Sequence, residues 1–159
     1  MKTSVVTGGA SGIGLELSKL LIQDNYKVFI IDNNNKNLQK LKTCLNTNSF
    51  EGIKEDMSSV SSPKKIYNKL KDKNICISAL CPGQTNTNFQ KSVSSKKNKI
   101  KFNTSCPVKV AKYGYEALKA NNTISIPGYF NKFLVFLNRL LPRNIVTKIV
   151  RYIQEKNRN

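Results

Sequence analysis

The sequence contains no histidine and only four cysteines, at positions 44, 76, 81 and 106, none of them in a Cys-x-x-Cys pair. Common zinc sites take their ligands from these two residue types, so the sequence predicts no metal site. The same scarcity excludes a disulfide-stabilised scaffold. We interpret the four thiols as reduced packing residues.

Long hydrophobic runs are also missing. The longest covers residues 133–137, which is five residues, whereas a membrane-spanning helix needs about 18. Met1-Lys2 leads directly into the strand-like TSVVT, so we expect no signal peptide. By default these absences predict a cytoplasmic protein.

Acidic residues are few. Nine Asp and Glu stand against 27 Lys and Arg, which gives a net charge of +18. Residues 1–80 carry 12 bases and 7 acids (+5), and residues 81–159 carry 15 bases and 2 acids (+13), so any anionic partner should meet the second half. An AT-rich coding bias toward Lys and Asn would produce the same excess. No nucleic-acid motif accompanies the charge, so we expect no nucleic-acid partner.

With 159 residues, 39% of them hydrophobic, the chain can bury one core without cross-links. Apolar patterning predicts five strands that alternate with helices, which indicates an α/β fold with a doubly wound parallel sheet. We expect strands within 3–7, 27–32, 49–56, 74–81 and 123–128. We expect helices within 15–25, 37–45, 61–70 and 106–119, and then two C-terminal amphipathic helices divided at Pro142.

A glycine turn, Gly8-x-x-x-Gly12-x-Gly14, lies between the first predicted strand and the first helix. Glycines allow a tight turn and let backbone N–H groups approach a pyrophosphate, whose charge is favoured at a helix N-terminus. This context predicts a dinucleotide site. The alternative is a turn that packs strand against helix and binds nothing.

Asp32 ends the second predicted strand, 18 residues after Gly14. A carboxylate at this place can accept hydrogen bonds from the adenosine ribose hydroxyls and repels a 2′-phosphate, so it favours NAD, with NADP less likely. Lys36 is the residue that could reverse this preference. The alternative is that Asp32 only begins a turn.

These motifs resemble the short-chain dehydrogenase/reductase family. The resemblance is carried by TGGASGIG (7–14), Asp32, Glu55-Asp56-Met57 and ALCPGQTNTNF (79–89), and residues 108–118 and 126–143 resemble its broad-specificity ketoreductase-like branch. It implies a Rossmann-like fold and hydride transfer between a nicotinamide cofactor and an alcohol or ketone. It also implies roles for further cofactor-binding residues: Gly8, Ser11, Gly12, Ile13 and Gly14 for the phosphates and adjoining ribose, Asp56 for the adenine, Pro82 and Gly83 for the nicotinamide pocket, and Thr87 for the carboxamide or a phosphate.

The resemblance also implies a missing internal segment. Family members run to roughly 250 residues, and this chain has no NNAG segment, no catalytic Ser and no Tyr-x-x-x-Lys pair in family order. Three such pairs do occur, at positions 67 and 71, 115 and 119, and 152 and 156, and we interpret them as chance matches. We therefore assign no catalytic residue. The chain is predicted to be one truncated domain, with a nucleotide-binding core (1–83), a polar loop (84–106) and C-terminal helices left from a substrate lid (107–159).

Three functions stay open. The first is an NAD(P)-dependent oxidoreductase that lacks positioned acid–base catalysis. The second is a non-catalytic nucleotide-binding relic, from which a gene fragment could not be distinguished. The third is a peripheral membrane-surface binder that acts through the basic C-terminal half.

The missing segment leads to a structural prediction. Intact family members order their strands 3-2-1-4-5-6-7, so the loss of strands 4 and 5 would leave strand 1 with an open edge. We predict that the strand at 74–81 moves in beside strand 1, with Ile75, Ile77 and Leu80 as its apolar side chains. The alternative is an exposed, aggregation-prone edge. Because the segment that forms the family's dimer face is also missing, we expect no standard tetramer.

Overall fold

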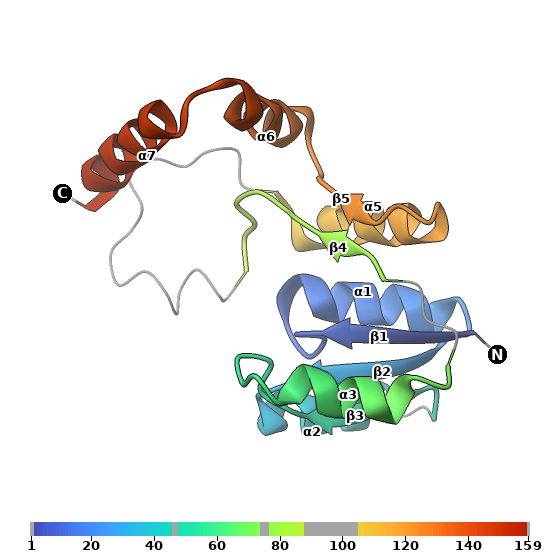
Figure 1. Ribbon diagram of the computed structural model, residues 1–159. Helices are drawn as coiled ribbons and strands as arrows, with labels where there is room; N and C mark the ends of the chain where they lie inside the picture. The colour runs from blue at the N-terminus through green and yellow to red at the C-terminus, as the bar shows by residue number, and fades with distance from the viewer. Residues whose placement is uncertain (1, 46–47, 74–76, 88–104, 159) are drawn as a thin grey trace.

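The computed structural model describes residues 2–45, 48–73, 77–87 and 105–158 (Figure 1). In this part of the chain, strands and helices alternate as the sequence predicts. The elements are β1 (Thr3–Thr7), α1 (Gly12–Gln23), β2 (Lys27–Asp32), α2 (Asn35–Leu45), β3 (Phe50–Lys54), α3 (Ser62–Leu70), β4 (Ala79–Leu80), α5 (Pro107–Lys119), β5 (Ile124–Ser125), α6 (Tyr129–Leu140) and α7 (Arg143–Arg158).

The first three strands form a parallel sheet in the order β1-β2-β3. Val5 of β1 pairs with Phe29 of β2, which pairs with Glu51 of β3. The central strand has the sequence KVFIID, and its last five residues are all buried. A β-branched, apolar run without alternation is typical of a parallel strand covered on both faces, and this is the doubly wound arrangement that the sequence predicts.

Helices cover both faces of this sheet. On one face Val28 and Ile30 of β2 pack in a single cluster with Leu21 of α1 and with Leu38 and Leu41 of α2. The side chains of neighbouring positions on β2 point to the other face, where α3 lies (Figure 1). The sheet therefore has buried side chains on both faces, since Phe29 and Ile31 are also buried, and the carboxyl end of β1 leads into the glycine turn.

The last two strands form a separate parallel sheet in which Ala79 pairs with Ile124 and Leu80 with Ser125. The prediction that this segment moves in beside β1 is therefore wrong for the residues described, while Ile75 lies outside them. The N–H groups of Ala79 and Cys81 donate to carbonyl oxygens of the β5 segment at 2.8 and 2.9 Å. Because β5 satisfies these donors, β4 has a pairing partner without β1.

Helix α5 joins the two sheets by packing along α1 (Figure 1). Its inward face is made of small residues, Ala111, Gly114 and Ala117, all buried. A Cβ placed on Gly114 would lie 2.8 Å from Leu80 of β4, so this glycine allows β4 to approach the helix closely. The close contact anchors the smaller sheet to α5 rather than to the edge of β1.

The C-terminal region forms the two expected helices, α6 and α7, divided at Pro142. They extend away from both sheets (Figure 1), and α6 contains no buried residue. No helix in the described part of the chain is long and apolar enough to cross a bilayer.

Candidate nucleotide site

The glycine turn leaves β1 at its carboxyl end and enters α1. Gly8 has φ +64° and Gly12 has φ +54°, a left-handed conformation that side chains with a Cβ rarely adopt. The turn is held against β2, because the Gly8 N–H donates to the carbonyl oxygen of Ile31 at 2.8 Å. The turn geometry therefore explains both glycines.

Packing explains Gly14, whereas open space surrounds Gly8. A Cβ at position 14 would lie 2.2 Å from the carbonyl oxygen of Gly8, but a Cβ at position 8 would meet no atom within 4 Å. Gly14 thus lets α1 approach the turn, as a purely structural glycine would. Gly8 exposes backbone to an empty region, and this is the feature that a closely approaching ligand requires.

The N-terminus of α1 opens beside this turn. The first helical hydrogen bond runs from the Leu15 N–H to the Ser11 carbonyl oxygen at 3.1 Å, and the side chain of Ser11 does not cap the helix. The N–H groups of Gly12, Ile13 and Gly14 precede that bond and therefore lack intrahelical acceptors. Together with the helix dipole they favour an anion at this position.

Asp32 is buried, with 7% of its surface exposed, and it joins the end of β2 to the glycine turn. One carboxylate oxygen accepts from the Ala10 N–H at 3.1 Å, and the other accepts from the Asn34 N–H at 2.9 Å. Each carboxylate oxygen has two acceptor sites, so acceptor capacity remains on both. The bond to Ala10 was not predictable from the sequence, because no local pattern signals a contact across 22 residues.

Glu55 and Asp56 follow β3. Asp56 is exposed, and its carboxylate accepts from the Ser58 N–H at 2.9 Å, a bond that lowers the pKa of Asp56. Glu55 accepts from the Ser62 hydroxyl at 2.7 Å, and this bond is the main reason that its pKa is lowered. Because the strands are parallel, β2 and β3 end at the same edge of the sheet, and so Asp32 and Asp56 share that edge.

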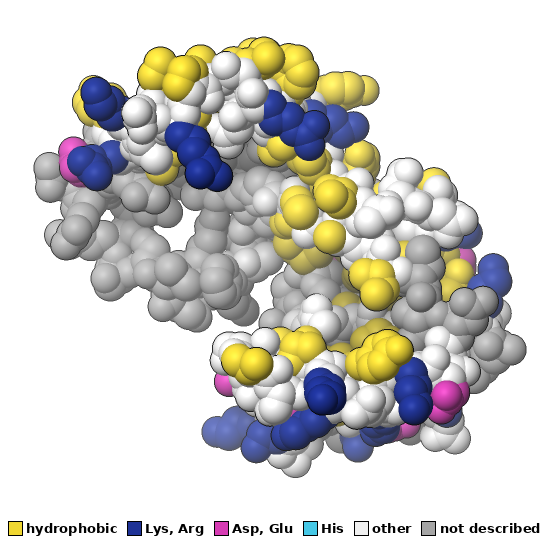
Figure 2. Space-filling model, viewed as in Figure 1, with side chains coloured by type: hydrophobic (Ala, Val, Ile, Leu, Met, Phe, Trp, Pro, Cys, Tyr) yellow, Lys and Arg dark blue, Asp and Glu magenta, His cyan; other side chains and the backbone are white. Residues whose placement is uncertain are grey.

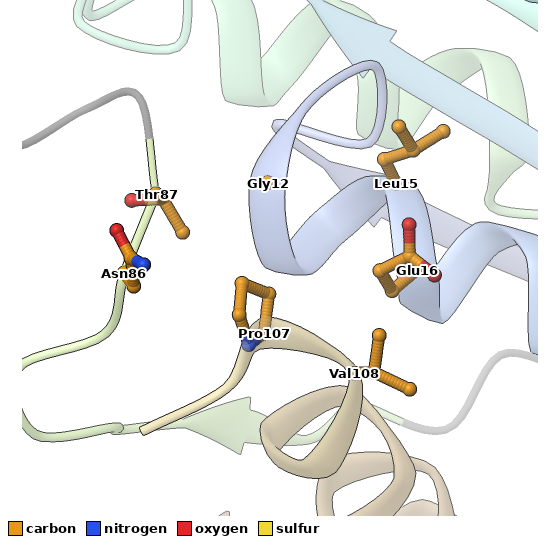
Figure 3. Close-up of a pocket in the computed structure, with 7 residues that line it drawn as sticks. All are labelled: Gly12, Leu15, Glu16, Asn86, Thr87, Pro107 and Val108. Carbon is orange, nitrogen blue, oxygen red and sulfur yellow. The ribbon is translucent and has the colours of Figure 1, made fainter. Parts of the chain in front are cut away.

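Thr87 comes from a distant segment and lies against the glycine turn. Its Cγ2 atom is 3.3 Å from where a Cβ of Gly12 would stand. The two residues line one open pocket of about 260 Å³ between the N-termini of α1 and α5 (Figure 3). The remaining lining residues are Leu15, Glu16, Asn86, Pro107 and Val108. Pro107 and Val108 were missed by the sequence analysis, although Pro at the first turn of a predicted helix does mark a helix N-terminus.

Pro82 and Gly83 follow β4 and contact a different part of the molecule. A Cβ on Gly83 would lie 2.5 Å from the side-chain amide nitrogen of Asn131, near the start of α6. That amide in turn donates to the Pro127 carbonyl oxygen at 2.8 Å. This turn is therefore fixed against α6, and it does not line the pocket described above.

None of the three Tyr-x-x-x-Lys pairs places its tyrosine in the pocket lining. Tyr67 and Tyr152 are about two-thirds exposed, at 67% and 66%. Tyr115 donates a short hydrogen bond to Asp24, the residue that ends α1, and Lys119 lies 3.4 Å from the same carboxylate oxygen. Asp24 is one helix length from Gly12, about 18 Å, so this cluster lies at the opposite end of α1 from the pocket.

Burial and the hydrogen bond to Asp24 raise the pKa of Tyr115. A tyrosine that serves as the proton donor in carbonyl reduction needs a lowered pKa instead, so that it can give up its proton. The electrostatics of the cluster are therefore those of a structural link between α1 and α5.

This link predicts a pH-dependent contribution to stability. The hydrogen bond from Tyr115 lowers the pKa of Asp24 below its usual value, so the contribution is present above about pH 4 and is lost as the pH falls through the lowered pKa. We expect Asp24→Asn to be modestly less stable than wild type at pH 7, and the difference to shrink as the pH falls below about 4. Urea unfolding at pH 7 and at a series of pH values below 4 measures it. Glu116→Gln is the control, because it removes one negative charge from α5. If the difference in stability between wild type and Asp24→Asn did not depend on pH, the proposed role of Asp24 in this link would be contradicted.

A family model described as short chain dehydrogenase matches residues 2–73 of this chain, which include the glycine turn, Asp32 and Asp56. The match places residues 2–73, a little under half of the chain, with the short-chain dehydrogenases. No curated protein sequence matches the chain significantly.

Two solved structures share the fold. A short-chain dehydrogenase from Sphingobium yanoikuyae in complex with NADPH aligns with a TM-score of 0.63 and 10% identity, over 81% of this chain and 88% of that one. A bulky-bulky ketone specific alcohol dehydrogenase from Comamonas testosteroni aligns with a TM-score of 0.59 and 9% identity, over 93% and 94%. At these identities the likeness establishes the fold.

A third relative shows the difference in length. A 4-hydroxyisoleucine dehydrogenase complexed with NADH aligns over 52% of this chain, with 21% identity and a TM-score of 0.40. The aligned part is 37% of that protein, so this chain spans little more than a third of its length.

Proposed function

We propose that this chain binds a nicotinamide dinucleotide at the glycine turn, with NAD preferred over NADP. The observation that carries the proposal is the open space in front of Gly8, directly beside the uncapped N-terminus of α1. A structural turn alone explains Gly14 but requires no such space. A short-chain dehydrogenase with this fold is solved in complex with NADPH, which supports a nicotinamide cofactor but not the choice between the two.

Each site residue has a proposed task in cofactor binding. The N–H groups of Gly12, Ile13 and Gly14 would hold the phosphates, and Asp32 would accept from a ribose hydroxyl while it keeps its bonds to Ala10 and Asn34. The remaining assignments are Gly8 and Ser11 at the phosphates and ribose, Asp56 at the adenine, Thr87 at the carboxamide or a phosphate, and Pro82 and Gly83 at the nicotinamide pocket. The preference for NAD rests on the buried carboxylate of Asp32, which would repel a 2′-phosphate.

When bound, a nicotinamide ring supplies a hydride donor or acceptor. Reduction of a ketone also needs a positioned acid, and no tyrosine is among the residues that line the pocket. A missing general acid typically lowers a rate by about 10² to 10⁴-fold. We therefore propose that the chain binds cofactor but transfers hydride to or from an alcohol or ketone only weakly. We also propose that it is one truncated domain, made of a nucleotide-binding core (1–83), a polar loop (84–106) and C-terminal helices (107–159).

Titration of the full chain with NADH and NADPH, followed by cofactor fluorescence, tests this proposal. We expect saturable binding with NADH tighter than NADPH. Asp32→Ala should weaken NADH binding by about 10 to 100-fold, because a charged acceptor is lost. It should also lower the free energy of unfolding by about 1–3 kcal/mol, because the buried Ala10 N–H loses its acceptor.

The matched control is Asp72→Ala, which removes an exposed carboxylate that follows α3 and should leave both stability and NADH binding nearly unchanged. Asp32→Asn retains one acceptor oxygen and separates loss of binding from loss of folding. Absence of NADH binding to folded wild-type protein would contradict the proposal, as would tighter binding of NADPH. Brisk ketone reduction by the purified chain would contradict the weak turnover alone.

A further inference from the structure

The two C-terminal helices each expose an apolar stripe. On α6 the stripe is Tyr129, Phe133, Phe136 and Leu140, at positions i, i+4, i+7 and i+11, and these side chains are 91%, 56%, 57% and 65% exposed. On α7 it is Ile145, Ile149 and Tyr152, at i, i+4 and i+7, and these three are exposed as well. Such spacing places each set on one side of its helix. We call these seven residues the apolar face.

Nothing in the described part of the chain covers the apolar face. Figure 2 shows hydrophobic side chains gathered along the outer surface of α6 and α7, well away from the two sheets. Large apolar side chains grouped in this way mark an interaction site rather than an ordinary surface.

Basic charges dominate around the apolar face, and Glu155 near the end of α7 is the one acidic residue of these two helices. No acidic residue lies between Glu116 and Glu155, and Lys and Arg side chains lie beside the hydrophobic ones on both helices (Figure 2). Lys132 and Arg139 belong to α6, and Arg143, Lys148 and Arg151 lie on α7 beside its apolar residues. The partner of this face must therefore combine an apolar layer with negative charge.

We infer that α6 and α7 lie flat on an anionic lipid bilayer, with the apolar face in the headgroup boundary. A bilayer with anionic headgroups offers acyl chains for the aromatic and aliphatic side chains and negative charge for the five bases. A second copy of this chain fits poorly, because it would bring two strongly basic surfaces together. This inference does not depend on cofactor binding, because the proposed cofactor site is at the glycine turn and not on α6 or α7.

The charge requirement makes the inference specific. Each Lys or Arg near an anionic surface contributes about fivefold to membrane partitioning. Salt screens this attraction, since the Debye length falls from about 10 Å at 0.1 M to about 3 Å at 1 M. Binding that depends on both lipid charge and salt is therefore the signature of this face.

Vesicle sedimentation of the full chain tests the inference. We expect co-sedimentation with phosphatidylcholine vesicles that contain phosphatidylserine, little with phosphatidylcholine alone, and release at about 1 M NaCl. Arg139→Gln with Arg143→Gln should reduce partitioning about 25-fold, at fivefold for each residue. Lys40→Gln with Lys42→Gln removes the same charge from α2, where both side chains are exposed, and should change partitioning less than about twofold.

A second pair of substitutions tests the apolar face itself. Phe133→Ser with Phe136→Ser should abolish most vesicle binding but leave the thermal melting curve and NADH titration unchanged, since both side chains are exposed. Four results would overturn the inference: no binding to anionic vesicles, equal binding to neutral ones, equal effects of the α2 and α6–α7 charge pairs, or a lipid-free dimer that the serine pair dissociates. The last result would assign the apolar face to a second copy.

Discussion

Gly14→Ala is expected to lower the free energy of unfolding by about 3 kcal/mol, the upper end of the range for overpacked sites. The added Cβ would lie 2.2 Å from the Gly8 carbonyl oxygen and 2.8 Å from its carbon. Both are backbone atoms, and the turn that holds them is bonded to Ile31 of the central strand. The clash therefore cannot be relieved by a change of rotamer.

Urea unfolding followed by far-UV circular dichroism measures this loss. Gly52→Ala is the matched control, because its Cβ would lie 3.3 Å from the end of the Leu38 side chain, which can shift, and it should cost less than about 1 kcal/mol. If Gly14→Ala proved as stable as wild type, the close approach of α1 to the turn would be wrong. The close approach of α1 to the turn also positions the uncapped N–H groups of α1. We therefore expect the Gly14→Ala protein that does fold to have lost NADH binding.

Local sequence patterns predicted the order and positions of the elements well. The run KVFIID marks a doubly covered strand because every residue type in its middle is apolar, and β2 occupies those six residues. Pro142 divides the C-terminal helices because proline cannot continue a helix, and α6 and α7 lie on either side of it. Such signals act within a few residues of the chain, and so the sequence alone expresses them.

Contacts between distant segments were not predictable in the same way. The contact of Thr87 with Gly12 and the bond from Ala10 to Asp32 depend on how elements are brought together in three dimensions. The pair Tyr115 and Lys119 matches a catalytic spacing, yet Asp24 takes up both side chains at the far end of α1. The role of a titratable pair follows from its third partner, which spacing does not reveal.

The pairing of β4 was predicted wrongly, because leaving the edge of β1 unpaired was expected to cost more free energy than any other arrangement. The pairing of β4 is decided instead by two contacts with later segments of the chain. Gly114 lets β4 pack tightly against α5, and the carbonyl oxygens of Thr123 and Ser125 accept the N–H groups of Ala79 and Cys81. These contacts hold the segment in its own small sheet, and in the described residues the outer edge of β1 is left without a strand.

The backbone of β1 shows which of its residues face this open edge. The Lys27 N–H donates to the Lys2 carbonyl oxygen, and the Gly8 N–H donates to that of Ile31, both at 2.8 Å. Backbone groups alternate in direction along a strand, so those of even-numbered residues point toward β2. The N–H of Val6 is therefore part of the ladder, and the N–H of Val5 points to the outer edge.

Proline at these two neighbouring positions should consequently have very different effects. Proline lacks the N–H donor, and a strand tolerates it where that donor faces an open edge. We expect Val6→Pro to be at least about 2 kcal/mol more destabilising than Val5→Pro, because it leaves an acceptor on β2 buried and unpaired. Val5→Ala and Val6→Ala, measured in parallel by urea unfolding, correct for side-chain packing, since Val6 is buried and Val5 is only partly so. Equal losses after this correction would mean that the outer edge of β1 is hydrogen-bonded, as the pairing predicted from the sequence requires.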